Sequence, residues 1–167
     1  MEIADYLGLL TEENRKATLD MLGFSKQSVA RLVNTEYATL RKDMTIASAL
    51  EYLRKHQPDT ETANVVYVVD ERGRLIEDIP LRRLVLNDPS KKVEDVMDKF
   101  CLKLDIDDTK ETAIEKFKQY DRTVLPVTNK EDVLMGVITI DDIMDEEEKL
   151  ATREIQRFGG MESLEYP

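Results

Sequence analysis

Apolar residues follow a helical period first and a strand pattern afterwards. The helical stripe, at i, i+3, i+4 and i+7, consists of Ile46, Ala49, Leu50 and Leu53. Two apolar, β-branched runs follow at 65–69 and 75–79, and a polar turn separates them. A short apolar run at 37–40 precedes the helix, and Pro80 can open a closing helix that runs to Leu86. The pattern predicts a β-α-β-β-α unit.

The same unit occurs a second time. Residues 107–117 repeat 43–53 at an offset of 64, and residues 126–135 repeat 67–76 at an offset of 59. The difference is an insertion near 57–61. The strands expected in the second unit are 101–104, 124–128 and 133–138. Because each unit alone would expose an apolar face that the other can cover, the repeat predicts two paired units with a cleft between them.

Helices are predicted on both sides of the paired units. Thr11 and Ser25 can each cap a short helix, and the second helix carries an apolar face at Val29 and Val33. The expected boundaries are 1–33 for these helices, 34–96 and 97–147 for the two units, and 148–167 for a further helix and tail.

Composition narrows the classes of function. The 167 residues are 41% hydrophobic, which supports one or two small cores, and the net charge of −11 makes nucleic acid an unexpected partner. The single cysteine, Cys101, is expected inside a strand, and with the single histidine, His56, it is too little for a zinc site. No signal peptide and no apolar stretch of about 18 residues is present.

No catalytic set is present either. The sequence lacks a Ser/His/Asp set, a Cys/His pair and a glycine-rich phosphate loop. We therefore expect a binding module rather than an enzyme.

A strand-to-helix junction at 136–143 ends the second unit. Thr139, followed by Asp142 three residues later, is typical of a capping box. The alternative is a nucleotide site, in which phosphate meets the free N–H groups of the helix start and Asp142 accepts hydrogen bonds from ribose hydroxyls. The spacing alone favours the cap.

The first unit does not preserve this junction. The positions that match Gly136, Thr139 and Asp142 hold Glu77, Pro80 and Arg83. The two halves of the cleft therefore differ in chemistry. Arg82 and Arg83 could bind a phosphate tail there, and a solvated basic turn is the alternative.

An acidic run leaves the second unit. Its six carboxylates are Asp141, Asp142, Asp145, Glu146, Glu147 and Glu148. Like charges at i,i+4 cost roughly 0.2–0.5 kcal/mol for each pair. A hard divalent cation such as Mg²⁺ would reverse that cost by sharing oxygens. The alternative is an exposed acidic helix face, which the charge pattern alone favours.

Residues 123–127, together with the junction at 136–143, resemble the CBS repeat, and the resemblance covers about residues 35–147. It implies an α+β fold, a tandem CBS pair or Bateman module of two β-α-β-β-α units. It also implies ATP or another adenine nucleotide in the cleft between the repeats. The candidate nucleotide-binding residues are Thr139, Asp142, Arg82 and Arg83.

Residues 34–37 and 61–70 resemble the first CBS repeat of the MgtE family of magnesium channels, and residues 151–160 resemble that family's connecting, or plug, helix. Residues 1–33 would then be the end of a helical N domain. The resemblance implies a homodimeric Mg²⁺ sensor at the cytoplasmic face of the membrane, whose partner is the pore domain of the same full-length chain. Bridging of acidic groups by Mg²⁺ would favour the closed pore.

The resemblance also implies the metal ligands. Carried over by position, they are Asp142, Asp145, Glu148 and Glu154. Asp141, Glu146 and Glu147 are additional local carboxylates and complete the set of metal candidates. Leu150 and Arg153 depart from the family pattern because other members carry acidic groups at these positions. A nucleotide-sensing module and a plain dimerisation element remain the alternative functions.

Overall fold

The computed structural model describes residue 23 and residues 27–56 and 64–145 of the 167. Several predictions lie outside the described residues: the helices capped by Thr11 and Ser25 in large part, and the helix and tail at 148–167. The metal candidates Glu146, Glu147, Glu148 and Glu154 lie outside them as well. No helix in the described part of the chain is long and apolar enough to cross a bilayer.

The repeat folds into two three-stranded sheets. Copy one consists of β1 (Thr39–Leu40), α3 (Ile46–Lys55), β2 (Val65–Val69), β3 (Leu75–Pro80) and α4 (Leu81–Val85). Copy two consists of β4 (Leu104–Asp105), α5 (Lys110–Tyr120), β5 (Val124–Thr128), β6 (Leu134–Thr139) and a helix over residues 140–145. In each sheet the first strand is parallel and the third antiparallel to the central one. The β-α-β-β-α order predicted from the sequence is confirmed.

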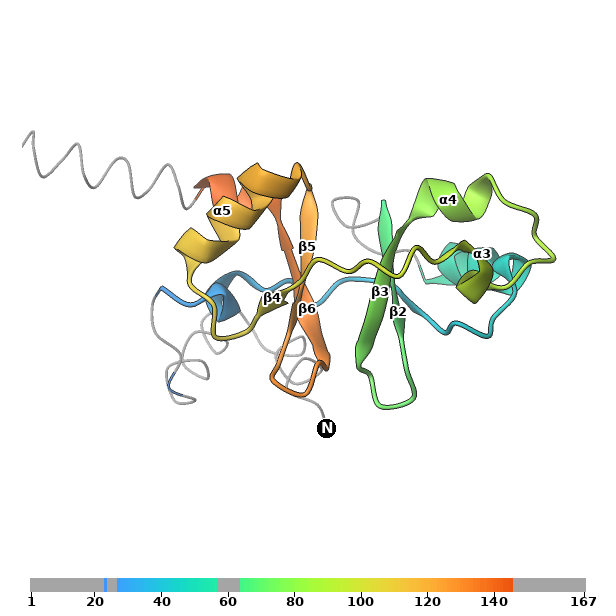
Figure 1. Ribbon diagram of the computed structural model, residues 1–167, viewed down its shortest axis with the longest axis horizontal. Helices are drawn as coiled ribbons and strands as arrows, with labels where there is room; N and C mark the ends of the chain where they lie inside the picture. The colour runs from blue at the N-terminus through green and yellow to red at the C-terminus, as the bar shows by residue number, and fades with distance from the viewer. Residues whose placement is uncertain (1–22, 24–26, 57–63, 146–167) are drawn as a thin grey trace, which may run out of the picture.

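The helices cover the outer faces of the two sheets, and the inner faces meet (Figure 1). Thr45 and Thr109 cap α3 and α5 by accepting hydrogen bonds from backbone N–H groups three residues on, at 3.1 and 3.2 Å. Each copy then buries its own apolar core between sheet and helices. The inner faces share a third cluster, whose buried members are Tyr67, Val69, Leu75, Val124, Leu134 and Val137.

Each segment that leads into one copy packs on the other copy. The short 3₁₀-helix η1 (Val29–Leu32) precedes copy one and packs in the core of copy two. At the matching position, 64 residues later, η2 (Val93–Val96) precedes copy two and packs on the core of copy one. Two isolated β-bridges also join each segment to the other copy: Ser28 pairs with Thr109 of copy two, and Lys92 pairs with Thr45 of copy one. We call residues 28–34 and 92–99 the lead-in segments.

Two details differ from the sequence-based expectation. The first strand of each copy is shorter than predicted, and Cys101 lies before β4 rather than inside it. In copy two, the backbone ahead of β4 is still bound to copy one, through the N–H groups of Asp98 and Lys99. In addition, Pro80 is the last residue of β3, so α4 begins one residue later than expected.

Candidate functional site

A cleft of about 670 Å³ opens where the two copies meet, at the end of the sheets where β2 and β5 begin. Its lining is mixed: apolar side chains from α4 and the strand ends, with two arginines and a few polar groups. The lining residues are Asn64, Val65, Pro80, Leu81, Arg82, Val85, Leu86, Asp121, Arg122, Thr123 and Val124. Such a surface suits a ligand that has both an apolar face and a charged end.

The same backbone arrangement brings both strand-to-helix junctions to this end of the molecule. The N–H of Leu81 donates to the Asn64 carbonyl at 2.8 Å, and the N–H of Ile140 donates to the Thr123 carbonyl at 2.7 Å. The described lining combines the copy-one junction with residues 121–124 of copy two. Residues 62 and 63, which match Asp121 and Arg122, lie outside the described residues.

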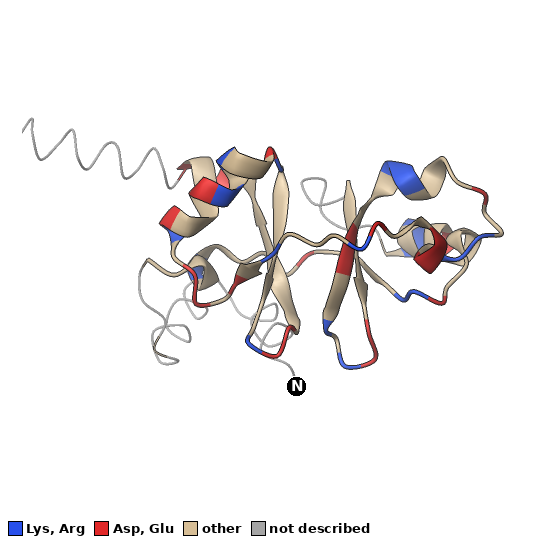
Figure 2. Cartoon of the chain, in the orientation of Figure 1, with Lys and Arg blue, Asp and Glu red and all other residues tan. Residues whose placement is uncertain are grey.

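Arg122 crosses from copy two to copy one. Its Nη1 donates to the Asp78 carboxylate of β3 at 3.0 Å, and the Asp78 side chain is only 5% exposed. Asp78 and its neighbour Glu77 form the red band on β3 in Figure 2. Burial raises the pKa of the Asp78 carboxyl, and the Arg122 charge opposes that rise. The ion pair therefore holds a guanidinium at the edge of the cleft.

The two arginines predicted to bind phosphate take different positions. Arg82 lines the cleft. Arg83 lies against the second lead-in segment, where it donates to the Val96 carbonyl at 3.3 Å and pairs with the Asp98 carboxylate at 3.4 Å. Only Arg82 of this pair can contact a ligand in the described half of the cleft.

Thr139 acts as a helix cap. Its hydroxyl accepts a hydrogen bond from the N–H of Asp142 at 3.3 Å, and Thr139 is 2% exposed. The described lining of the cleft includes neither Thr139 nor Asp142. The Thr139 half of the predicted capping box is thus observed, while the nucleotide role of these two residues stays a prediction.

Three of the metal candidates lie on the described helix at 140–145. Asp141 and Asp145 are exposed, and Asp142 is half-buried. Among the described residues, no group of three or more His, Cys, Asp or Glu side chains is placed to hold a metal ion. Because four further candidates lie outside these residues, the Mg²⁺ site stays a prediction.

Sequence reasoning missed the roles of Gly136 and Glu77. Gly136 is crossed by the first lead-in segment: Asn34 exchanges hydrogen bonds of 2.7 and 2.9 Å with Val137. A Cβ on Gly136 would lie 2.1 Å from Val33 Cγ1. At the matching position of copy one, the buried Glu77 carboxylate accepts hydrogen bonds from the N–H groups of Asp98 and Lys99. Both positions bind a lead-in segment, one by close approach and the other by a carboxylate.

Two groups near Asp78 have raised pKa values: the half-buried Cys101 thiol and the buried Tyr67 hydroxyl. Burial, and then the Asp78 charge, raise the pKa of the Cys101 thiol to about 11. The thiolate needed for nucleophilic or redox chemistry is therefore scarce at neutral pH. Tyr67 is fully buried, and its hydroxyl has no hydrogen-bond partner in the part of the chain that the structure describes. Its pKa is raised well above the ordinary value by burial.

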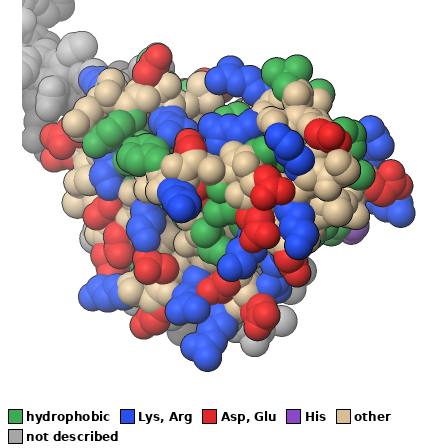
Figure 3. Space-filling model, turned by 45° about the vertical axis from the view of Figure 1, so that its right-hand side comes forward, with side chains coloured by type: hydrophobic (Ala, Val, Ile, Leu, Met, Phe, Trp, Pro, Cys, Tyr) green, Lys and Arg blue, Asp and Glu red, His purple; other side chains and the backbone are tan. Residues whose placement is uncertain are grey.

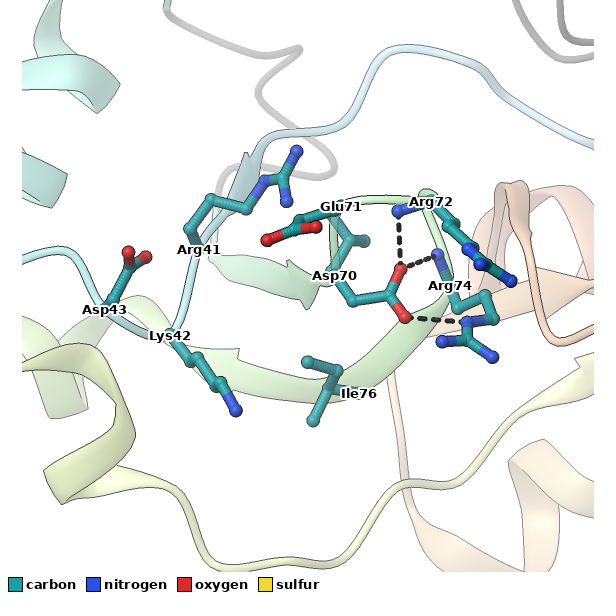
Figure 4. A pocket seen from close by; sticks show the side chains of 9 residues that line it. Arg41, Lys42, Asp43, Asp70, Glu71, Arg72, Arg74 and Ile76 are labelled. Carbon is teal, nitrogen blue, oxygen red and sulfur yellow. Dashed lines mark hydrogen bonds and ion pairs between the residues drawn. The ribbon is translucent and has the colours of Figure 1, made fainter.

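A second hollow of about 390 Å³ lies at the opposite end of copy one, between the loop after β1 and the β2–β3 turn (Figure 4). Its charges are mixed: Arg41 and Lys42 face a turn that carries Asp70 and Glu71. Asp70 is occupied, since it accepts hydrogen bonds from Arg74 Nε at 2.6 Å and from two backbone N–H groups. Basic and acidic side chains are likewise intermixed over the face in Figure 3. We therefore place the candidate site in the cleft.

Comparison with known families and curated proteins gives consistent matches. The CBS domain family model matches residues 29–86 and 93–149. The magnesium transporter MgtE of Thermus thermophilus is 34% identical over 154 residues, 92% of this chain and 34% of the relative. The MgtE of Enterococcus faecalis is 32% identical over 127 residues, 75% of this chain and 28% of the relative. The chain thus spans about a third of the curated relatives it matches.

Two solved structures have the same fold. The cytosolic domain of the Mg²⁺ channel MgtE in complex with ATP gives a TM-score of 0.72 at 34% identity, over 83% of this chain and 56% of that chain. The soluble part of a magnesium transporter gives a TM-score of 0.74 at 29% identity, over 89% of this chain and 58% of that chain.

Proposed function

Because the chain belongs to the CBS domain family and is similar to the cytosolic part of MgtE transporters, we propose that it is the Mg²⁺-sensing regulatory region of an MgtE-type magnesium transporter. It would work as a homodimer at the cytoplasmic face of the membrane. The pore would lie in the rest of a longer chain, since the curated relatives are about three times as long as the matched segment.

The observation that carries this proposal is the acidic helix that leaves copy two. Its described start places Asp141 and Asp145 one turn apart, both exposed, and the sequence continues with Glu146, Glu147 and Glu148. Repulsion among these carboxylates disfavours close approach of the helix to other acidic surfaces. Mg²⁺ bound through carboxylates and retained waters would remove that repulsion and hold the helix in a closed arrangement. Loss of Mg²⁺ would release it and allow the pore to open.

Thermal unfolding of the 167-residue chain tests the proposal. A ligand that binds only the folded state adds about 2.7 kcal/mol of stability at 100 times its Kd. We expect millimolar MgCl₂ to raise Tm more than NaCl of equal ionic strength. The effect should shrink in an Asp141→Asn/Asp145→Asn variant. Equal shifts in MgCl₂ and NaCl for the wild type would refute Mg²⁺ sensing by this region.

The cleft favours a second function, binding of an adenine nucleotide. It combines an apolar lining with Arg82 and Arg122, and a relative at 34% identity has been solved with ATP. Calorimetric titration with ATP and AMP tests this function. If Asp142→Ala binds ATP as tightly as the wild type, the ribose role predicted for Asp142 is wrong. The two functions are compatible within one chain.

A further inference from the structure

We propose that the contacts which hold the second lead-in segment on copy one, made by Glu77 and Arg83, form a latch that can open, and that α4 couples this latch to the cleft. When the latch opens, α4 and copy two can move independently of each other. The inference rests on the proposed nucleotide function and adds to it how an occupied cleft acts on the joint between the copies.

The latch consists of two contacts of different strength. Glu77 in β3 is buried and accepts hydrogen bonds from the N–H groups of Asp98 and Lys99. Arg83 in α4 donates to the Val96 carbonyl at 3.3 Å and pairs with the Asp98 carboxylate at 3.4 Å. The side chains of Arg83 and Asp98 are 31% and 50% exposed, so solvent weakens their attraction. The contact with α4 is therefore the weaker of the two.

The first lead-in segment is held in a different way. Asn34 matches Asp98 at the offset of 64, and Asp142 matches Arg83 at the offset of 59, so the same ion pair cannot form in copy two. Asn34 instead exchanges backbone hydrogen bonds of 2.7 and 2.9 Å with Val137. Side-chain contacts, which can break while the strands stay paired, thus hold the second crossing, and a backbone pair holds the first.

The short helix α4 joins the latch to the cleft. It spans only Leu81–Val85, and it contributes Arg82 and Val85 to the lining. The next side chain after Arg82, that of Arg83, reaches the second lead-in segment. Residues 121–124 of copy two line the same cleft. A ligand that contacts both parts of the lining therefore holds α4 in place, and with it the Arg83 contact.

The second lead-in segment links these contacts to copy two. It belongs to the connection that crosses the middle of the molecule from copy one to β4 (Figure 1). Leu102, three residues after its end, is buried in the core of copy two. Lys99 has a left-handed backbone (φ 63°), which is unfavourable for a residue other than glycine. Release of its N–H from Glu77 lets this backbone relax, which favours opening.

Hydrogen exchange of the Asp98 and Lys99 amides, followed by NMR on the 167-residue chain, measures opening of the latch. Both amides donate to Glu77, so their exchange requires release from copy one. Asp98→Asn removes the charge that Arg83 contacts and keeps an acceptor for the Phe100 N–H. It should lower the protection of both amides about threefold, the size of one partly exposed ion pair, and leave that of the Asn34 amide unchanged.

Two further variants show whether the ion pair is responsible. Arg83→Gln should lower the protection at least as far as Asp98→Asn, because the bond to the Val96 carbonyl is lost too. The double variant should add little to Arg83→Gln alone. Arg54→Gln is the matched control, since it removes an arginine that makes an exposed ion pair within α3, with Glu51 at 3.6 Å. Equal protection in the wild type, Asp98→Asn and Arg83→Gln would overturn the latch.

Saturating ATP tests the coupling to the cleft, with calorimetric titration in parallel to measure binding. If ATP binds only while the latch is closed, protection of the two amides rises by up to about 100-fold at 100 times its Kd. The gain should shrink in Asp98→Asn, whose affinity for ATP should equal that of the wild type because Asp98 is not in the described lining. Binding of ATP without a change in protection would overturn the inference and leave nucleotide binding intact. Absence of ATP binding would overturn both.

Discussion

A methyl group on Gly136 would lie 2.1 Å from Cγ1 of Val33. Gly136 belongs to β6 of copy two, and Val33 belongs to the segment that leads into copy one. The next residue, Asn34, pairs with Val137 through both of its backbone groups. The glycine thus gives the first lead-in segment room to lie on the sheet of the other copy, and it ties the start of one repeat to the end of the next.

We expect Gly136→Ala to destabilise the fold. The new Cβ forces apart two backbones that are joined by hydrogen bonds, and overpacking of this kind costs typically about 1–3 kcal/mol. Urea denaturation followed by circular dichroism measures the change in the free energy of unfolding. Val33→Ala in the same background should recover part of the loss, because the Asn34 carbonyl, 2.9 Å from the new Cβ, still clashes. Strictly additive effects of the two substitutions would contradict the contact.

In copy one, Glu77 holds the second lead-in segment on the sheet. We expect Glu77→Ala to destabilise the fold as well. The substitution leaves the N–H groups of Asp98 and Lys99 without their acceptor. Each such loss costs about 1–3 kcal/mol where the group stays buried. Glu94→Ala, at an exposed site on η2, is the matched control and should stay within about 0.5 kcal/mol. Similar losses for both substitutions in the same denaturation assay would argue against a specific role of Glu77.

The sequence predicts the two units well because their signals are local. The helical stripe of α3 and the apolar runs of β2 and β3 specify element type and order within one unit. The resemblance to CBS repeats and to the MgtE family is confirmed by the matches to both. The domain boundaries and the metal ligands stay predictions.

The exchange of lead-in segments could not be predicted in this way. Periodicity assigns η1 an apolar face but does not say which copy that face will cover. Gly136 suggested a ligand-binding junction, and its actual constraint, the approach of Val33, comes from 103 positions away in the chain. The Asp78–Arg122 pair is also non-local, because its members are 44 positions apart in the chain. The pattern of charges along the sequence does not indicate which residues will form an ion pair at that separation.

Thr139 should contribute a cap that copy one lacks. Its hydroxyl accepts from the Asp142 N–H, whereas the matching Pro80 makes no side-chain cap bond to α4. We expect Thr139→Ala to cost about 1 kcal/mol, within the usual range of about 0.5–2 for a lost cap, and Thr139→Ser to retain most of the stability. The two variants are compared by thermal and urea unfolding. Equal losses for Ala and Ser would show that the methyl group, rather than the hydroxyl, is what matters.

When the pH is lowered, Asp70 and Glu77 should change the stability of the fold in opposite directions. Hydrogen bonds from the Arg74 and Arg72 backbone N–H groups and the Arg74 side chain lower the pKa of Asp70 below its usual value of 3.8. Its stabilising contribution is complete above the unfolded-state pKa and is lost as the pH falls through the folded-state value. Burial raises the pKa of Glu77 above 4.5. Its folded state therefore holds a proton more tightly, and stability is lost as the pH rises through the folded-state pKa.

The two opposite pH dependences of stability are distinguished by comparing the wild type, at each pH, with a variant in which the carboxyl is replaced by an amide that cannot titrate. As the pH is lowered from 7 to about 2.5, the wild type should lose stability relative to Asp70→Asn, chiefly below the ordinary aspartate range near pH 3.9. Over the range above about pH 4.3, it should instead gain stability relative to Glu77→Gln. Urea midpoints at each pH give both differences, and Asp43→Asn, in the same hollow as Asp70, is the control for a simple loss of charge. Curves with the same slope for both comparisons would mean that the backbone N–H groups at Asp70, or the burial of Glu77, do not act as the structure indicates.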